Sequence, residues 1–131
     1  MSEPRWVLPE VVHAIHKMLI AEHGGLPGIR DQGLLDSALA RPRQQAAYAK
    51  KNSIFQLVAA AYSYGLARNH PFVDGNKRIA LTVAAVFLEI NGHTLNAPEA
   101  EAVLMYQQLA DGTLTEQALA EWIREWSVLS S

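Results

Sequence analysis

The sequence predicts an all-α fold, a compact bundle of about six helices in one domain over residues 1–131. Apolar residues recur through most of the chain at the 3.6-residue period of a helix. The alternating apolar and polar runs that indicate strands are missing, and prolines and glycines stand where the periodic segments begin and end. A chain of 131 residues, half of them apolar, is long enough to bury one core and too short for two ordinary domains.

The first two helices are predicted from their end signals. The first begins near Pro9, because proline suits the first turn of a helix, and ends at the glycine pair 24–25. Its buried side is expected to hold Val12, Ile15, Leu19 and Ile20. The second begins after Asp31, whose carboxylate can cap it, and ends around 41–42, because the residue before a proline avoids helical angles. The polar and basic segment 42–52 is interpreted as a surface loop or flap.

The third and fourth helices are expected to form the centre of the domain. Ser53 is a suitable N-cap for the third, which ends one or two residues before Pro71. The fourth runs over about 76–91 and stops at Gly92. Its stretch 79–88 has no charged residue on any side, which is typical of a helix surrounded by others. We therefore expect this helix to be the hub of the fold.

The last two helices follow in the C-terminal third. Pro98 opens the fifth, and the sixth begins with Thr115. Their apolar residues are Val103, Leu104 and Leu109 in the fifth, and Ala118, Leu119, Trp122, Ile123 and Trp126 in the sixth. The segment that joins the two most buried helices is then the loop 70–75, where the chemistry of the chain is concentrated.

Composition and charge exclude several classes of function. Eleven basic and thirteen acidic side chains give a formal charge of -2, so no overall field draws the protein to nucleic acid or to an anionic membrane. The absence of cysteine excludes disulfides, thiolate catalysis and thiolate zinc sites. The N-terminal segment has no apolar signal region, and no later run approaches the length of a membrane span. We expect a cytoplasmic protein.

The sequence HPFVDGNKR, residues 70–78, has the charge pattern of a phosphate site. Lys77 and Arg78 fall in the first turn of the predicted fourth helix, where free N–H groups and the helix dipole disfavour cations. A bound phosphate would remove this conflict, because the N–H groups, the dipole and both cations would then face one anion. Gly75 would let the backbone approach that anion closely. Alternatively, both side chains extend into solvent at little cost.

Two further residues of the loop have both a structural and a functional interpretation. Asp74 can be an ordinary N-cap, or it can hold Mg²⁺ together with phosphate oxygens and water. His70 can be structural, or its imidazole can accept the proton of an attacking hydroxyl. The neighbouring Pro71 and Phe72 are interpreted as scaffolding that fixes the loop in the core.

These residues resemble the motif H-x-F-x-[DE]-G-N-x-R of the Fic/Doc family, in which it lies between two helices of an all-α domain. Each fixed position is matched, by His70, Phe72, Asp74, Gly75, Asn76 and Arg78. The resemblance to the Doc, or death-on-curing, branch covers nearly the whole chain and is weakest after Pro98. It implies that His70 is the general base and that Asp74 holds Mg²⁺. It also implies that Gly75, Asn76 and Lys77 form an anion hole and that Arg78 clamps the phosphates of ATP.

The resemblance also bears on which group is transferred. The adenylylating pattern H-P-F-x-x-G-N-G-R-x-x-R has a glycine and an arginine where this chain has Lys77 and Leu81. The Doc branch shares the lysine, and there ATP is bound in the reverse sense so that the γ-phosphate reaches a threonine of elongation factor Tu. This implies a toxin kinase that arrests growth. Gly75 and Pro71 are at home in the adenylylating branch, so AMP transfer is the alternative.

The resemblance implies a regulator in trans. Many Fic proteins inhibit themselves through a helix with the pattern [ST]-x-x-x-E-[GN], but no glutamate of this chain precedes glycine or asparagine. An antitoxin whose C-terminal segment folds into a groove would then be the inhibitor. The flap around Tyr48 can position the substrate by strand addition or be an ordinary loop. A non-catalytic module that binds an antitoxin is the alternative of another class, and toxicity that disappears with His70→Ala would discard it.

Three other features are interpreted structurally. His13 and His16 are spaced to share a metal, but with no third ligand nearby they are expected to be surface residues. Trp122 and Trp126 are expected to pack against other helices. The basic cluster of Arg41, Arg43, Lys50 and Lys51 is too small for the basic field that RNA binding requires.

Overall fold

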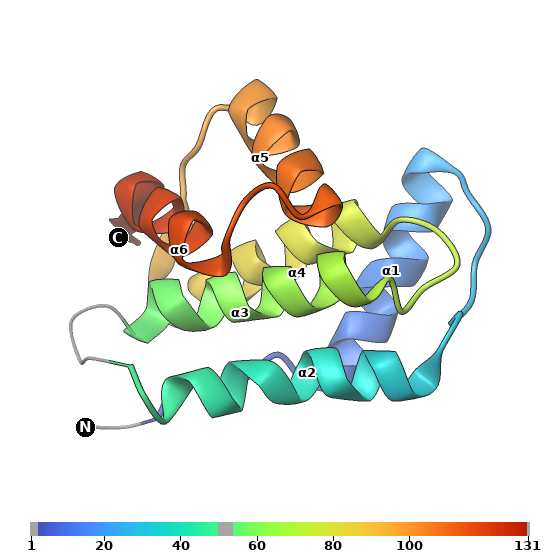
Figure 1. Cartoon of the computed structure of the whole chain (residues 1–131), viewed down its shortest axis with the longest axis horizontal. Coiled ribbons are helices and arrows are strands. Elements are labelled where there is room, and N and C mark those ends of the chain that lie inside the picture. The colour runs from blue at the N-terminus through green and yellow to red at the C-terminus, as the bar shows by residue number, and fades with distance from the viewer. Residues whose placement is uncertain (1–2, 50–53, 131) are drawn as a thin grey trace.

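The computed structural model describes residues 3–49 and 54–130, and most of these residues are helical (Figure 1). The helices are α1 (Pro9–His23), α2 (Gln32–Ala46), α3 (Ile54–Asn69), α4 (Asn76–Ile90), α5 (Glu99–Asp111) and α6 (Glu116–Trp126). The predicted all-α fold with six helices is thus confirmed for the described ranges. The N-cap expected at Ser53 lies outside them.

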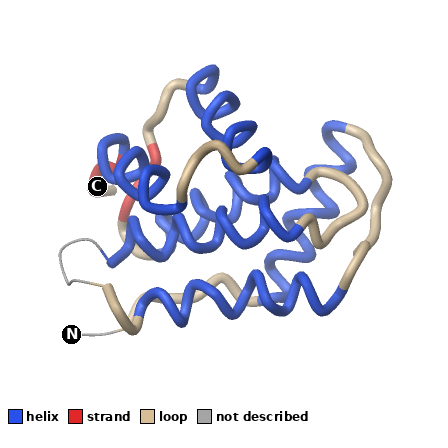
Figure 2. The backbone as a smooth tube through the Cα atoms, viewed as in Figure 1, coloured by secondary structure: helices blue, strands red, loops and turns tan. Residues whose placement is uncertain are grey.

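A small sheet is present that the sequence did not predict. Strands β1 (His93–Leu95) and β2 (Ser127–Leu129) pair antiparallel, with Thr94 opposite Val128 (Figure 2). Each strand has three residues, which is too short for an alternating pattern to be recognised. The pair ties the end of α6 to the turn that follows α4.

Helix α2 is longer than expected. It continues through Pro42 to Ala46, so the predicted end around Arg41 is wrong, and the segment expected as a loop from Pro42 is helical over its first part. A proline inside a helix removes one hydrogen bond and costs about 3 kcal/mol. Here the ring is buried, and Arg41 in the same turn forms an ion pair with Glu116 of α6. These tertiary contacts offset the local preference.

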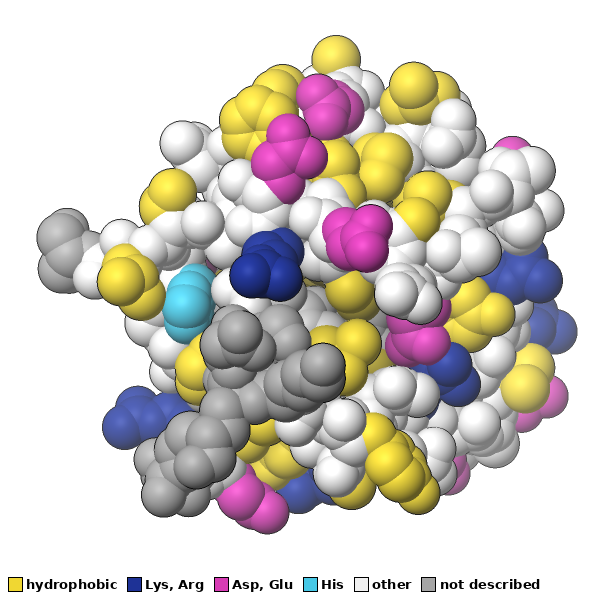
Figure 3. Space-filling model, turned by 60° about the vertical axis from the view of Figure 1, so that its left-hand side comes forward, with side chains coloured by type: hydrophobic (Ala, Val, Ile, Leu, Met, Phe, Trp, Pro, Cys, Tyr) yellow, Lys and Arg dark blue, Asp and Glu magenta, His cyan; other side chains and the backbone are white. Residues whose placement is uncertain are grey.

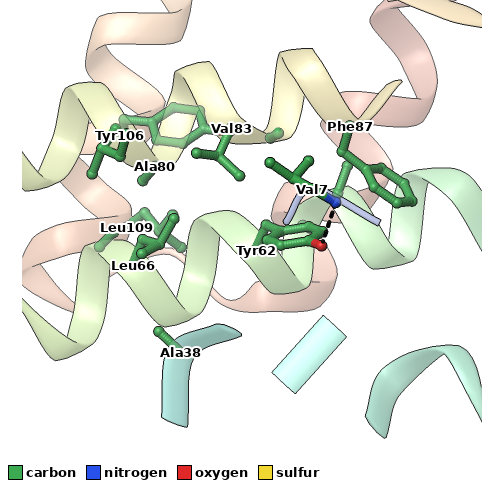
Figure 4. Close-up of a cluster of buried hydrophobic side chains, with 14 of the residues drawn as sticks. Val7, Ala38, Tyr62, Leu66, Ala80, Val83, Phe87, Tyr106 and Leu109 are labelled. Atoms are coloured by element: carbon green, nitrogen blue, oxygen red, sulfur yellow. Dashed lines mark hydrogen bonds between the residues drawn. The ribbon is translucent and has the colours of Figure 1, made fainter. Parts of the chain in front are cut away.

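Helix α3 has the central place that we expected for α4. It packs against α2, α4, α5 and α6, as Figure 1 shows with α2 on one side of it and α5 on the other. Figure 4 shows Tyr62 and Leu66 of α3 facing Val83 and Phe87 of α4 across this core. As expected, α4 is itself largely surrounded, and its uncharged stretch packs against α1, α3 and α5. The loop between α3 and α4 therefore joins the two most buried helices, as the sequence predicts.

None of the helices within the described ranges has both the length and the apolar character that a membrane span requires.

Candidate active site

The loop 70–75 is closed on itself by the first residue of α4. Asn76 accepts a hydrogen bond from Phe72 N through Oδ1 and donates one to Phe72 O through Nδ2, both at 3.0 Å. Phe72 is only 1% exposed, so its ring anchors the loop in the core as expected. The amide of Asn76 satisfies both backbone groups of a buried residue, which would otherwise lack partners.

The connector between α1 and α2, residues 24–31, lies along the outer side of this loop. Arg30 N donates to Pro71 O at 2.7 Å, and Val73 N donates to Gly28 O at 3.1 Å. Figure 1 shows the two connectors together at the right-hand end of the molecule. Because these bonds join backbone to backbone, they fix the path of the loop without depending on most of its side chains.

His70 stands at the start of the loop in a conformation that side chains rarely adopt. Its φ is 48°, in the left-handed region, which costs on the order of 1 kcal/mol or more for a residue with a Cβ. Arg30 secures this turn, because its Nε donates to His70 O at 2.7 Å and its Nη2 donates to Asn69 O at 2.9 Å. The imidazole itself is exposed and can meet a hydroxyl on another molecule.

Asp74 is not the N-cap of α4, so that interpretation is wrong. The N-cap is Gly75, at φ 80°, with no side-chain cap bond. Asp74 instead accepts a hydrogen bond from Leu26 N at 2.8 Å through Oδ2. Helix α4 therefore begins one residue later than the capping pattern predicts. The Asp74 carboxylate bonds the Leu26 N–H of the connector and not an N–H of the helix.

The exposed Asp74 carboxylate suits Mg²⁺ but cannot hold it alone. No group of three or more acidic or histidine side chains within the described ranges could form a metal cage. Mg²⁺ in nucleotide sites is typically held by one or two carboxylates, with phosphate oxygens and water completing six positions. The donor set therefore fits a magnesium ion that arrives with a nucleotide and does not fit a resident metal.

His16 is not a surface residue, in contrast to our expectation. It is 4% exposed, its ring stacks on Phe72 with centroids 3.8 Å apart, and its Nε2 lies 2.8 Å from Asp74 O. His13, one turn earlier, is half-buried and meets Phe72 edge-on. His16 lies on the same helix face as Val12 and Leu19, at i+4 and i−3, and this spacing could have identified it as buried.

A pocket of about 350 Å³ adjoins the N-terminus of α4. Its lining residues are Gly75, Asn76, Lys77, Arg78 and Leu81 from the N-cap and first turns of α4, and Ala102, Val103, Tyr106 and Gln107 from α5. Its polar end consists of the helix N-terminus and two exposed cations, with no acidic side chain in the first turn. Its other wall is mainly apolar. This volume lies within the range of small-molecule sites.

The structure divides the predicted site residues into two groups. Gly75, Asn76, Lys77 and Arg78 line the pocket together, whereas His70 and Asp74 lie on the loop beside it and do not line it. Sequence reasoning missed the residues that support the loop, Arg30 and His16, and the α5 wall. No motif marks any of them.

The remaining basic and aromatic features have structural roles. Arg41 pairs with Glu116 and lies over Tyr64, and Arg43 lies over Trp6. Lys50 and Lys51 lie outside the described residues. The face in Figure 3 carries cations and carboxylates interspersed with apolar side chains, with no continuous basic field. Trp122 is buried and Trp126 packs against the core, as expected.

Comparison with known proteins places these residues in a family. A model of the Fic/DOC family matches residues 6–88, which include the whole loop. Protein kinase doc of Escherichia phage P1 is 34% identical over 121 residues, 92% of this chain and 94% of that protein. Toxin Doc of Mycolicibacterium smegmatis is 47% identical over 74 residues, 56% of this chain and 57% of that protein.

Proposed function

Because the chain belongs to the Fic/Doc family, we propose that it is the toxin of a toxin-antitoxin pair. In this proposal it is an enzyme that transfers the γ-phosphate of ATP to a Ser or Thr hydroxyl of a translation factor resembling elongation factor Tu. The observation that carries the proposal is the pocket at the start of α4, which has Lys77 and Arg78 at one end and an apolar wall at the other. A nucleotide has the same division, because its anionic phosphates are joined through the ribose to a base whose flat aromatic faces can lie on an apolar wall.

The phosphates are assigned to the polar end of the pocket. The N–H groups of Gly75, Asn76 and Lys77 form the anion hole, and the Arg78 guanidinium clamps phosphate oxygens. The base is assigned to the wall formed by α5. Lys77 and Arg78 are exposed, so their attraction for phosphate is weaker than that of buried cations and falls with salt.

His70 is assigned as the general base. It takes the proton of the acceptor hydroxyl, the oxygen attacks the γ-phosphorus, and the bond from that phosphorus to the β–γ bridging oxygen breaks. The products are the phosphorylated protein, ADP and one proton, which His70 releases to solvent. The exposed position of the imidazole suits an acceptor that is itself a protein.

Asp74 is assigned to Mg²⁺, which neutralises charge on the phosphates when it is bound with ATP. The Leu26 N–H bonds one carboxylate oxygen and orients the group. The other oxygen has no protein partner among the described residues, so it can face the metal.

Two positions favour phosphate transfer over AMP transfer. Lys77 adds a cation at the first turn of α4, where the adenylylating pattern has glycine. Leu81, which replaces the last arginine of that pattern, contributes an apolar side chain to the pocket wall, so no guanidinium lies there to bind a further phosphate. This change is consistent with a nucleotide bound in the reverse sense.

The partners in this proposal are the protein substrate and a cognate antitoxin that inhibits in trans. The name Toxin Doc of the Mycolicibacterium smegmatis relative supports a toxin, and the name Protein kinase doc of the phage P1 relative supports a kinase that acts on a protein. Inhibition in trans suits a loop whose general base is exposed, because a bound segment can cover it.

The test is the mass that the target gains. The protein is incubated with Mg·ATP and purified elongation factor Tu, and the intact mass of the factor is measured. We expect the gain of one phosphoryl group, and no gain with His70→Ala. The gain of one adenylyl group would instead support AMP transfer. A mass that is unchanged with both the wild type and His70→Ala would count against catalysis on this target. Toxicity on expression that disappears with His70→Ala would discard the non-catalytic alternative.

A further inference from the structure

We propose that His16 is a positioning residue that locks the peptide bond between Asp74 and Gly75, so that the Gly75 N–H faces the phosphate site. This inference rests on the proposed function, because it assigns a determinant of the anion hole. It concerns a residue of α1, which is distant in sequence from the motif.

The lock is a single hydrogen bond from a buried ring. His16 Nε2 lies 2.8 Å from Asp74 O, and a carbonyl oxygen can only accept, so Nε2 carries the proton. The ring is 4% exposed and stacks on Phe72 at an interplanar angle of 14°. Stacking on a buried ring restrains the imidazole, so the donor is held in one place.

The consequence follows from the geometry of the peptide group. In a trans peptide the C=O and the following N–H point in opposite directions. With Asp74 O directed to His16, the Gly75 N–H must point away from α1. No acceptor within the described ranges bonds this N–H, and Gly75 lines the pocket. It is therefore available to a phosphate oxygen.

Glycine makes such a lock necessary. Gly75 has a φ of 80°, and a residue without a Cβ adopts positive and negative φ about equally. The peptide group before a glycine can therefore rotate at low cost, which would turn the carbonyl towards the anion and the N–H away from it. A Cβ built on Gly75 would lie 3.6 Å from His16 Nε2, so the ring packs directly beneath this residue. His16 prevents the rotation that Gly75 permits.

Two substitutions separate this role from core packing. His16→Phe keeps a ring on Phe72 and removes the donor. His16→Gln removes the ring and keeps an N–H donor at a distance similar to Nε2. If His16 only fills space, His16→Phe is the milder change. If it locks the peptide, His16→Gln is the milder change for phosphate binding. His13→Phe on the same helix is the matched control, because His13 also contacts Phe72 but bonds no loop carbonyl.

The experiment is a titration of the ¹⁵N-labelled full chain with Mg·ADP and, separately, inorganic pyrophosphate, followed at the Gly75 amide resonance. We expect a large shift of this resonance in the wild type, His13→Phe and His16→Gln. We expect His16→Phe to bind both ligands roughly 10- to 100-fold more weakly, because the variant loses the equivalent of one hydrogen bond to a charged group. Thermal unfolding of each variant shows whether it is folded. Equal affinities in folded His16→Phe and the wild type would overturn the inference, as would lost binding in folded His16→Gln.

The wild type alone provides a second measurement, which applies even if His16→Phe does not fold. Long-range ¹H–¹⁵N spectra of the imidazole report which nitrogen carries the proton. The lock requires a proton on Nε2, and a neutral ring protonated only at Nδ1 would overturn it. A wild type that binds pyrophosphate at Gly75 and transfers no group would refute the proposed function and leave the lock standing. If neither ligand shifts the Gly75 amide resonance of the wild type, both the lock and the proposed function are overturned.

Discussion

Replacing Asn76 by alanine tests whether one side chain closes the loop 70–75. The substitution removes both bonds to Phe72 and leaves its N–H and C=O without partners in a buried position. Each of the two unsatisfied buried groups costs about 1–3 kcal/mol, so we expect the free energy of unfolding to fall by about 2–6 kcal/mol. That is a large part of the roughly 5–15 kcal/mol typical of a domain.

The assay is urea unfolding followed by circular dichroism, with thermal unfolding as a second measure. A loss of this size lowers the melting temperature of a domain of 131 residues by roughly 10 °C. Asn96→Ala is the control, because Asn96 is exposed and its side chain bonds nothing within the described ranges, and we expect it to change stability by at most about 0.5 kcal/mol. An Asn76→Ala variant as stable as the control would refute the account of the loop.

Three further predictions concern helix packing, the strained turn at His70 and the effect of pH on stability. Gly65→Ala places a Cβ 3.0 Å from the Ala38 backbone, so denaturant unfolding should show a loss of about 1–3 kcal/mol, and a gain would contradict the close approach of α2 and α3. Arg30→Ala frees the His70 carbonyl, so kcat should fall about tenfold or more with little change in melting temperature; an unchanged kcat would show that the strained turn does not need Arg30. Burial raises the pKa of Tyr106 above its ordinary 10.0, so the stability that its neutral form contributes is complete below about pH 10 and is lost as pH rises further. Melting temperatures of Tyr106→Phe should therefore fall less steeply than those of the wild type above about pH 10, and parallel curves would contradict this assignment.

Much of the fold could be predicted from local signals. Pro9 begins α1, and the side chains of Asp31 and Thr115 accept hydrogen bonds from the first turns of α2 and α6 as N-caps. Each is a local interaction, decided by residues within three or four positions. The uncharged stretch of α4 likewise indicated its buried place, because burial on all sides excludes charge at every position of a helix.

The errors have a common physical cause, which is contact with distant parts of the chain. Helix α2 continues through Pro42, where Arg41 forms an ion pair with Glu116 of α6. Asp74 does not cap α4, because its carboxylate accepts a hydrogen bond from Leu26 N. The burial of His16 could have been inferred from its place on the helix face of Val12 and Leu19, but its contact with Asp74 could not. No spacing rule could anticipate these contacts.

In the candidate site too, local signals predict some residues, and contacts between distant parts of the chain decide the others. The motif identifies Lys77 and Arg78 because the helix N-terminus gives their charge a local meaning. The residues of the opposite wall, such as Tyr106, depend on which face of α5 packs against α4. Val103 is apolar but exposed in this wall, so hydrophobicity alone does not identify the packed face. The residues on the α4 side of the pocket could therefore be predicted from the loop, but the shape of the pocket could not.

In the proposed reaction, this loop transfers the terminal phosphate of ATP to a protein hydroxyl. The most direct test uses ATP radiolabelled either at the γ-phosphate or at the α-phosphate, with Mg²⁺, elongation factor Tu and a His70→Ala control. We expect label on the factor from γ-labelled ATP, none from α-labelled ATP, and none with the variant. Label from α-labelled ATP would contradict this proposal.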